Sequence, residues 1–159
     1  MNPVIASTLH EGFRTSPTIR ALVDELDRSD LIVYVTGFSA DEYRRLRGTM
    51  RFVAVAGGRR FLRITVNERL LGDEQASALG HELQHAVEVA REPWVIDQAS
   101  FEDLYRHIGQ PSAVESRTPC YETEAARRAG ERVLTEIRTA RHTLAAVRRL
   151  AKAVGRMTR

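Results

Sequence analysis

Apolar residues in the first thirty positions change from no visible period to a helical one. Residues 1–15 show no clear spacing of apolar side chains, so we expect a loose lead-in there. Ser16 and Pro17 suit the cap and the first position of a helix. Apolar residues then recur every three or four positions, at Ile19, Leu22, Val23 and Leu26. This pattern predicts a helix over 17–28.

The next segments alternate between apolar and polar residues and are rich in β-branched side chains, which is typical of strands. A first run covers 31–35, and two further runs, 51–55 and 60–66, flank Gly57-Gly58. A Gly-Gly pair between alternating runs predicts a β-hairpin. Because the three strands are neighbours in sequence, we expect a small antiparallel three-stranded sheet.

Capping residues ahead of apolar periodicity predict four further helices. They are 40–47 after the capping box Ser39 and Glu42, 74–91 after Asp73, 101–108 capped by Ser100 and Asp103 and ended by Gly109, and 119–154 opening with Thr118-Pro119. Residues 110–117 are expected to form a loop. No repeat or linker divides the chain, so the simplest prediction is one α+β domain over 1–159, with the small sheet packed against helices and a long C-terminal helix.

One predicted helix carries the H-E-x-x-H pattern, His81-Glu82-Leu83-Gln84-His85. Residues four apart lie above one another on a helix, so both imidazoles can reach one metal ion. Glu82 lies about 100° further round, close enough to act on a water that the metal holds. The apolar residues of this helix cluster on the opposite side, which predicts one buried face and one that presents the histidines. Two imidazoles with a carboxylate suit zinc.

A zinc site of this kind requires a third protein ligand. Glu88 is on the histidine side but lies about 10 Å along the helix from His81, beyond direct reach of the metal. In the last predicted helix, Glu122 lines up with the apolar stripe, whereas Glu124 lies on the charged side. A buried carboxylate needs a cation or hydrogen-bond donors, so Glu122 is the expected zinc ligand. The alternative is an ordinary first-turn glutamate favoured by the helix dipole.

Composition narrows the function classes further. The chain has 159 residues, of which 43% are hydrophobic and 28% charged, and no apolar run is long enough to cross a bilayer. A folded, water-soluble protein is therefore expected. Cys120 is the only cysteine, which excludes an internal disulfide and a cysteine-rich zinc finger, and we interpret it as incidental. The start does not look like a secretory signal, so the compartment is left open, with the cytoplasm as the default.

The net charge of +3 is unevenly distributed. From Arg127 onward, ten lysines and arginines face only two glutamates, whereas the preceding residues are acidic overall. Residues 143–159 therefore form a predicted basic helical tail that suits an acidic surface or partner protein. The alternative is a solvated helix face. Nucleic acid is not an expected partner.

These motifs together resemble the gluzincin zinc metallopeptidases, in which a helix downstream of H-E-x-x-H supplies Glu-x-x-Ala. The small size and the order of helix, strands, helix and helix resemble their minimal version, the minigluzincins. Two segments, Gly80 to Glu88 and Tyr121 to Ala126, are also similar to a bacterial subgroup with this pattern. The resemblance covers about 15–130 and rests mainly on these two short motifs.

The resemblance implies a zincin-like active-site helix and one zinc ion held by His81, His85 and Glu122. It also implies that Glu82 is the general base and acid, and that a peptide substrate lies along part of the 51–66 hairpin. Gluzincins commonly place Asp or Ser-Asp after the ligand motif to orient the first histidine. This chain has Ala126 there, so the orienting group must come from elsewhere.

The group that would stabilise an oxyanion is left open by the sequence. Tyr121, Tyr105 and His107 are the candidates, although each residue type is more often found in packing or on the surface. Two main functions follow. The first is a zinc-dependent peptidase that acts on peptides or proteins, and the second is a non-catalytic zinc-binding or regulatory module. An interaction role for the basic tail is a third possibility.

Overall fold

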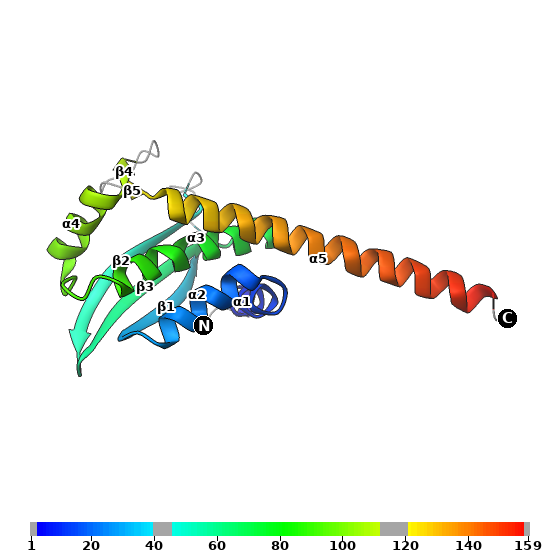
Figure 1. Ribbon diagram of the computed structural model, residues 1–159, viewed down its shortest axis with the longest axis horizontal. Helices are drawn as coiled ribbons and strands as arrows, with labels where there is room; N and C mark the ends of the chain where they lie inside the picture. The colour runs from blue at the N-terminus through cyan, green and yellow to red at the C-terminus, as the bar shows by residue number, and fades with distance from the viewer. Residues whose placement is uncertain (1–2, 40–45, 112–120, 158–159) are drawn as a thin grey trace.

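The computed structural model describes residues 3–39, 46–111 and 121–157. Its elements are α1 (Pro3–Thr15), α2 (Pro17–Asp27), β1 (Leu31–Phe38), β2 (Gly48–Ala56), β3 (Arg59–Asn67), α3 (Gly72–Ala90), α4 (Gln98–Ile108), β4 (Gln110–Pro111), β5 (Tyr121–Glu122) and α5 (Glu124–Met157). A three-stranded sheet lies beside α3, and α5 runs along α3 and far beyond it (Figure 1). The predicted α+β class is confirmed.

The sheet is mixed, so the prediction of an all-antiparallel sheet is wrong. Its order is β1-β3-β2, with β3 antiparallel to β2 but parallel to β1. The β2–β3 hairpin turns at Gly57 and Gly58, as predicted, and both residues have the positive φ that glycine adopts readily. Strand β3 takes the centre because its alternate residues Leu62, Ile64 and Val66 are fully buried, whereas β1 and β2 are only half-buried.

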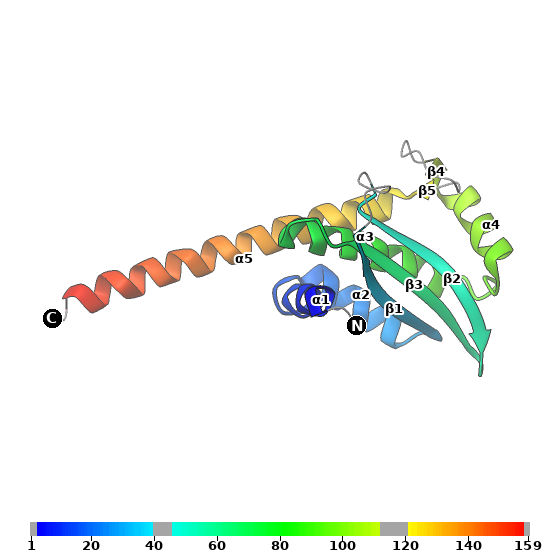
Figure 2. The same ribbon diagram turned by 180° about the vertical axis from the view of Figure 1, so that it is seen from behind.

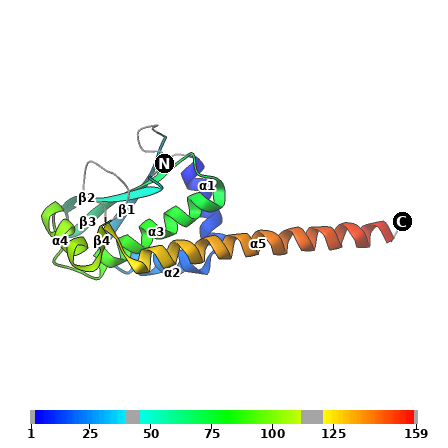
Figure 3. The same ribbon diagram turned by 90° about the horizontal axis from the view of Figure 1, so that it is seen from above.

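Helix α3 is buried on almost every side rather than on the one face that the apolar pattern predicted. The sheet, α1, α2 and α5 all pack against it (Figure 3), and even Gln75, Gln84 and Glu88 are buried. Small residues allow the close approach of α5. A Cβ on Gly80 would lie 2.6 Å from Val133 of α5, and one on Gly130 would lie 3.1 Å from the Ser77 carbonyl of α3. The two helices therefore hold their backbones close together beside the histidines.

Several predicted boundaries change in the structure. Residues 3–15 form α1 rather than a loose lead-in, whereas α2 begins after Ser16 as predicted, with the Ser16 hydroxyl accepting from the Ile19 amide. The predicted cap of α3 is wrong. The cap is Leu71, which offers no side-chain bond, and Asp73 lies in the first turn.

Helix α4 also starts earlier than predicted, because Asp97 and Ser100 form a reciprocal capping box, and it ends at Gly109 as expected. Its predicted caps, Ser100 and Asp103, are therefore wrong as assigned. The predicted helix over 40–47, most of the loop over 110–117, the Thr118-Pro119 helix start and Cys120 lie outside the described residues.

Helix α5 changes its surroundings along its length. Its first part is packed through the buried residues Ala126, Ala129, Val133 and Ile137. Beyond Ile137 the helix projects away from the rest of the molecule (Figure 2), and Leu144 and Val147 are exposed. In the part of the chain that the structure describes, no helix is apolar over a length that would span a membrane.

Candidate metal centre

The three predicted metal ligands meet in the structure. His81 and His85 come from the middle of α3, and Glu122 comes from β5. The His81 Nε2 atom lies 3.0 Å from Glu122 Oε1, and one ligand atom from each of the three residues lies within 4.8 Å of the others. His85 is buried, whereas His81 and Glu122 are half-buried. These residues form a group that could hold a metal ion.

Glu122 reaches this group from a strand rather than from a helix. Glu122 pairs with Gln110 and Tyr121 pairs with Pro111, so the short β4–β5 ladder fixes the Glu122 backbone just after α4. Helix α5 begins only at Glu124. The helical alignment that singled out Glu122 is therefore wrong for this residue, although its convergence with the histidines is found.

A buried chain of hydrogen bonds holds His85 in place. The His85 Nδ1 atom lies 2.8 Å from Glu88 Oε2, and the Thr123 hydroxyl donates to Glu88 Oε1 at 2.6 Å. Thr123 also accepts from the Ala126 amide, so it joins the start of α5 to the same chain. Glu88 fixes Nδ1 as the protonated nitrogen and leaves Nε2 of His85 for a metal. Glu88 is outside the ligand group, as predicted, but its contact with His85 follows from their spacing of three residues, which the sequence already showed.

Glu82 lies beside the ligands without joining them. Its side chain is 5% exposed, and the structure gives it no hydrogen bond to any described residue. Burial raises the pKa of its carboxyl above the ordinary value, more strongly than the nearby histidines lower it. A Cβ on Gly48 of β2 would lie only 2.7 Å from Glu82 Oε1, so the glycine leaves room for this carboxylate.

The electrostatics of the cluster fit a bound cation. Burial lowers the pKa of His81, but the hydrogen bond that its ring donates to Glu122 and the charges of Glu82, Glu122 and Glu88 outweigh this effect, so the pKa is raised. Burial alone would raise the pKa of Glu122, but its bond with His81 holds it below the ordinary value. Among the described residues, no lysine or arginine forms an ion pair with these glutamates. Such a concentration of buried carboxylates is costly unless positive charge offsets it.

Two imidazole nitrogens and one carboxylate oxygen are also a donor set that zinc accepts. Zinc bonds of about 2.0–2.1 Å set tetrahedral ligand atoms roughly 3.4 Å apart. The widest separation here, within 4.8 Å, is therefore only moderately larger than a bound ion requires. The residues present fit a zinc ion, with a fourth position for water or substrate.

The ligands open into a cavity of about 690 Å³. Its walls come from the start of β2, from α3 and α4, from β5 and from the first turns of α5, and they include Gly48, Glu82, Phe101, Tyr105 and Tyr121. The site is therefore accessible to a molecule much larger than water.

The three oxyanion candidates differ in position. The Tyr105 hydroxyl already donates to the His85 carbonyl at 2.9 Å, and burial with the charges of Glu88 and Glu82 raises its pKa well above the ordinary value. His107 is exposed and its Nδ1 lies 2.7 Å from the Asp103 carbonyl. Tyr121 is half-buried and lines the cavity. Tyr121 is thus the one of the three whose place in the cavity suits that role.

No family model, curated protein or solved structure matches this chain.

Proposed function

We propose that this chain is a zinc-dependent metallopeptidase. The observation that carries the proposal is the convergence of His81, His85 and Glu122 at a cavity, beside a buried glutamate that makes no hydrogen bond among the described residues. A structural zinc site would close the fourth position with another ligand, whereas this group opens into the cavity.

Each residue has a separate task in this proposal. His81, His85 and Glu122 hold the ion, and Glu88 keeps the His85 ring in the tautomer that offers Nε2. Zinc supplies Lewis acidity, which polarises a carbonyl and lowers the pKa of water. Glu82 takes a proton from the attacking water and returns it to the amine that leaves. Its place beside the ligands, where it makes no hydrogen bond to a described residue, leaves the carboxyl available for this exchange.

A variant series with metal analysis tests the ligand set. We expect purified protein to contain one equivalent of zinc, and His81→Ala and Glu122→Gln to lose it. Glu124→Gln is the matched control, because this exposed carboxylate lies two residues away and pairs with Arg127 and Arg128 instead. Retention of zinc by Glu122→Gln at wild-type affinity would exclude Glu122 as a ligand.

Cleavage of a broad peptide library tests the reaction. We expect metal-dependent cleavage by the wild type and a loss of at least 100-fold in Glu82→Gln with zinc still bound. Cleavage that survives this substitution would show that Glu82 is not the base.

A non-catalytic zinc-binding or regulatory module is the second candidate. The observation that favours it is that the Tyr105 hydroxyl already donates to the His85 carbonyl, which leaves Tyr121 as the one candidate of the three for stabilising an oxyanion. This candidate predicts one bound zinc and no turnover of any peptide in the library. It also predicts that Tyr121→Phe changes nothing, whereas the peptidase proposal allows a loss of activity there.

A further inference from the structure

The sheet has an outer face that carries aromatic and basic side chains. Helices α1, α2 and α3 contact the sheet on the side where residues such as Val33, Leu62 and Phe52 join the core, and α4 contacts the edge strand β2. The alternate residues point the other way, and Ile32 and Tyr34 are 38% and 50% exposed. In the described part of the chain, no helix covers this outer face.

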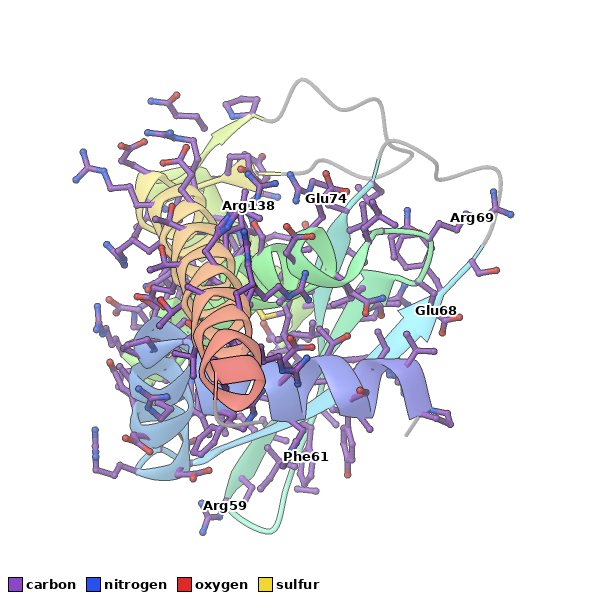
Figure 4. The ribbon with its side chains drawn as sticks, turned by 90° about the vertical axis from the view of Figure 1, so that its right-hand side faces the viewer. Arg59, Phe61, Glu68, Arg69, Glu74 and Arg138 are labelled. Atoms are coloured by element: carbon purple, nitrogen blue, oxygen red, sulfur yellow. The ribbon has the colours of Figure 1, made fainter. Side chains whose placement is uncertain are left out.

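The strand pairing gathers two rings and two guanidinium groups there. The parallel register places Tyr34 opposite Arg63 and Ile32 opposite Phe61, and the antiparallel register places Arg51 opposite Arg63. The Tyr34 and Phe61 rings are nearly parallel, at 15°, with centroids 6.1 Å apart. Phe61 and Arg59 lie at the opposite side of the molecule from Arg138 of α5 (Figure 4). The basic tail lies on the part of α5 that extends away from the sheet (Figure 1).

The face is purely cationic. None of the three strands contains an aspartate or glutamate. Of the two remaining arginines in the strands, Arg60 points inward to Asp30 and the exposed Arg59 donates to the Ser29 carbonyl. Arg51 and Arg63 are exposed, and neither has a hydrogen bond or ion pair among the described residues. Like charges directly opposite on neighbouring strands are destabilising, so an anionic ligand would relieve this arrangement.

We propose that the outer face, defined by Ile32, Tyr34, Arg51, Phe61 and Arg63, binds single-stranded nucleic acid. Unpaired bases stack on exposed aromatic rings of a sheet, and two rings serve two or three bases. The guanidinium groups of Arg51 and Arg63 contact the phosphates on either side. An acidic peptide or a lipid headgroup would use the arginines but would leave the rings without a stacking partner, and the bases of a duplex are not available for stacking.

Fluorescence anisotropy with a labelled 12-nucleotide oligothymidylate tests the proposal on the full chain. We expect binding that weakens as salt rises. Tyr34→Leu with Phe61→Leu keeps the apolar volume of the face but removes the rings, and we expect at least tenfold weaker binding with an unchanged salt dependence. Arg51→Gln with Arg63→Gln should weaken binding and reduce the logarithmic salt slope by about 1.4, since each phosphate contact contributes about 0.7.

The matched control is Arg148→Gln with Arg149→Gln, which removes the same charge from the projecting part of α5. We expect the control to retain most of the binding. If the control loses binding and the sheet variants keep it, the tail is the binding site and the proposal is wrong. Equal competition by duplex DNA, by polyglutamate or by anionic vesicles would also overturn it, because it would show a general anion surface.

This inference does not rest on the metal ligands, although Arg51 is also among the residues that line the cavity beside them. Glu82→Gln and the metal-free protein should bind the oligonucleotide as the wild type does, so failure of the peptidase proposal leaves it untouched. Circular dichroism of each variant verifies that the fold is intact. A folded leucine double variant with wild-type affinity would contradict the role of the rings.

Discussion

Two of the buried polar clusters along α3 differ in how their charges are balanced. At the C-terminal end of the helix, Arg60 of β3 is 3% exposed and donates to the carbonyls of Val89, Glu92 and Val95 at 2.8–3.2 Å. The same side chain forms a two-pronged ion pair with Asp30. In the middle of α3, the candidate metal centre instead gathers carboxylates around two imidazoles, and no lysine or arginine of the described residues forms an ion pair with them.

The charges of the Arg60 cluster balance within it, whereas those of the candidate metal centre do not. Arg60 supplies the donors that a helix C-terminus lacks, and its charge is balanced by the acid beside it. The metal centre has an excess of negative charge and an open cavity. Substitutions in the first cluster should therefore lower the free energy of unfolding, whereas substitutions in the second should alter metal binding or activity with little effect on the metal-free fold.

The largest expected effect is that of Arg60→Met, which keeps the apolar stem and removes every donor. The buried carbonyls at the end of α3 would lose their partners, so the free energy of unfolding should fall by about 3 kcal/mol. Urea unfolding of the metal-free protein measures this loss. Arg59→Met is the control, since Arg59 is exposed and its one hydrogen bond to a described residue is the one to the Ser29 carbonyl. If Arg60→Met and Arg59→Met lower the free energy of unfolding by the same amount, the Arg60 cluster does not stabilise the fold.

Glu88→Gln should act on the metal instead. Without its carboxylate, the His85 ring is held less firmly, and zinc affinity should fall by about 10- to 100-fold. A competition titration with a chelating dye measures the affinity, and Glu74→Gln, on the same helix but away from the ligands, is the control. If Glu88→Gln leaves the zinc affinity unchanged while the metal-free protein unfolds more easily, Glu88 stabilises the fold and does not support metal binding.

Gly48→Ala should affect activity alone, if the peptidase proposal holds. The added methyl would displace the end of the Glu82 side chain, which is flexible, so the fold and the zinc content should change little. A displaced base should lower the cleavage rate by about tenfold. Thr49→Ala is the neighbouring control. Wild-type cleavage by Gly48→Ala would show that the position of Glu82 is not critical.

The smallest effect concerns the pH dependence of stability. The hydrogen bond from Arg60, and then its charge, lower the pKa of Asp30 against the opposing effect of burial. A lowered folded pKa gives stability that is complete above the unfolded value near 3.9 and is lost as the pH falls through the folded value. Asp30→Asn should thus be slightly less stable than wild type at pH 7, with the difference vanishing in acid. Urea unfolding at pH 7, 5 and 3 measures it, and a difference that persists in acid would contradict this origin.

The sequence predicted which three side chains converge better than it predicted the arrangement of the strands. The H-E-x-x-H ligands depend on local spacing within one helix, which a sequence displays directly. The pairing of β1 with β3 depends on which strand is buried most deeply, and adjacency in sequence favoured the wrong partner. The outer face, where Tyr34 meets Phe61 and Arg63, is formed by that pairing and so was not visible in the sequence.

Two local predictions, the loose lead-in over 1–15 and the helical position of Glu122, were wrong because each depends on contacts with distant residues. The sequence did not predict helix α1 because two of its buried positions hold Thr8 and Gly12, which interrupt the apolar periodicity. Gly12 is required there because the Ile19 side chain packs directly against it. The sequence predicted Glu122 in a helix because its strand partner, Gln110, is twelve residues earlier, and local spacing does not show that the two residues pair. The start of α5 instead depends on Thr123, whose hydroxyl accepts from the Ala126 amide.

The projecting part of α5 has a consequence for how the chain resists proteolysis. Beyond Ile137 no described side chain is buried, and after Arg141, which reaches Glu11 and Asp73, no described residue has an ion pair. Such a helix is held by its own backbone and frays from its free end. Limited digestion with trypsin should therefore trim α5 at Arg148 and Arg149 and stop near Arg141, leaving a resistant fragment that keeps all three ligands.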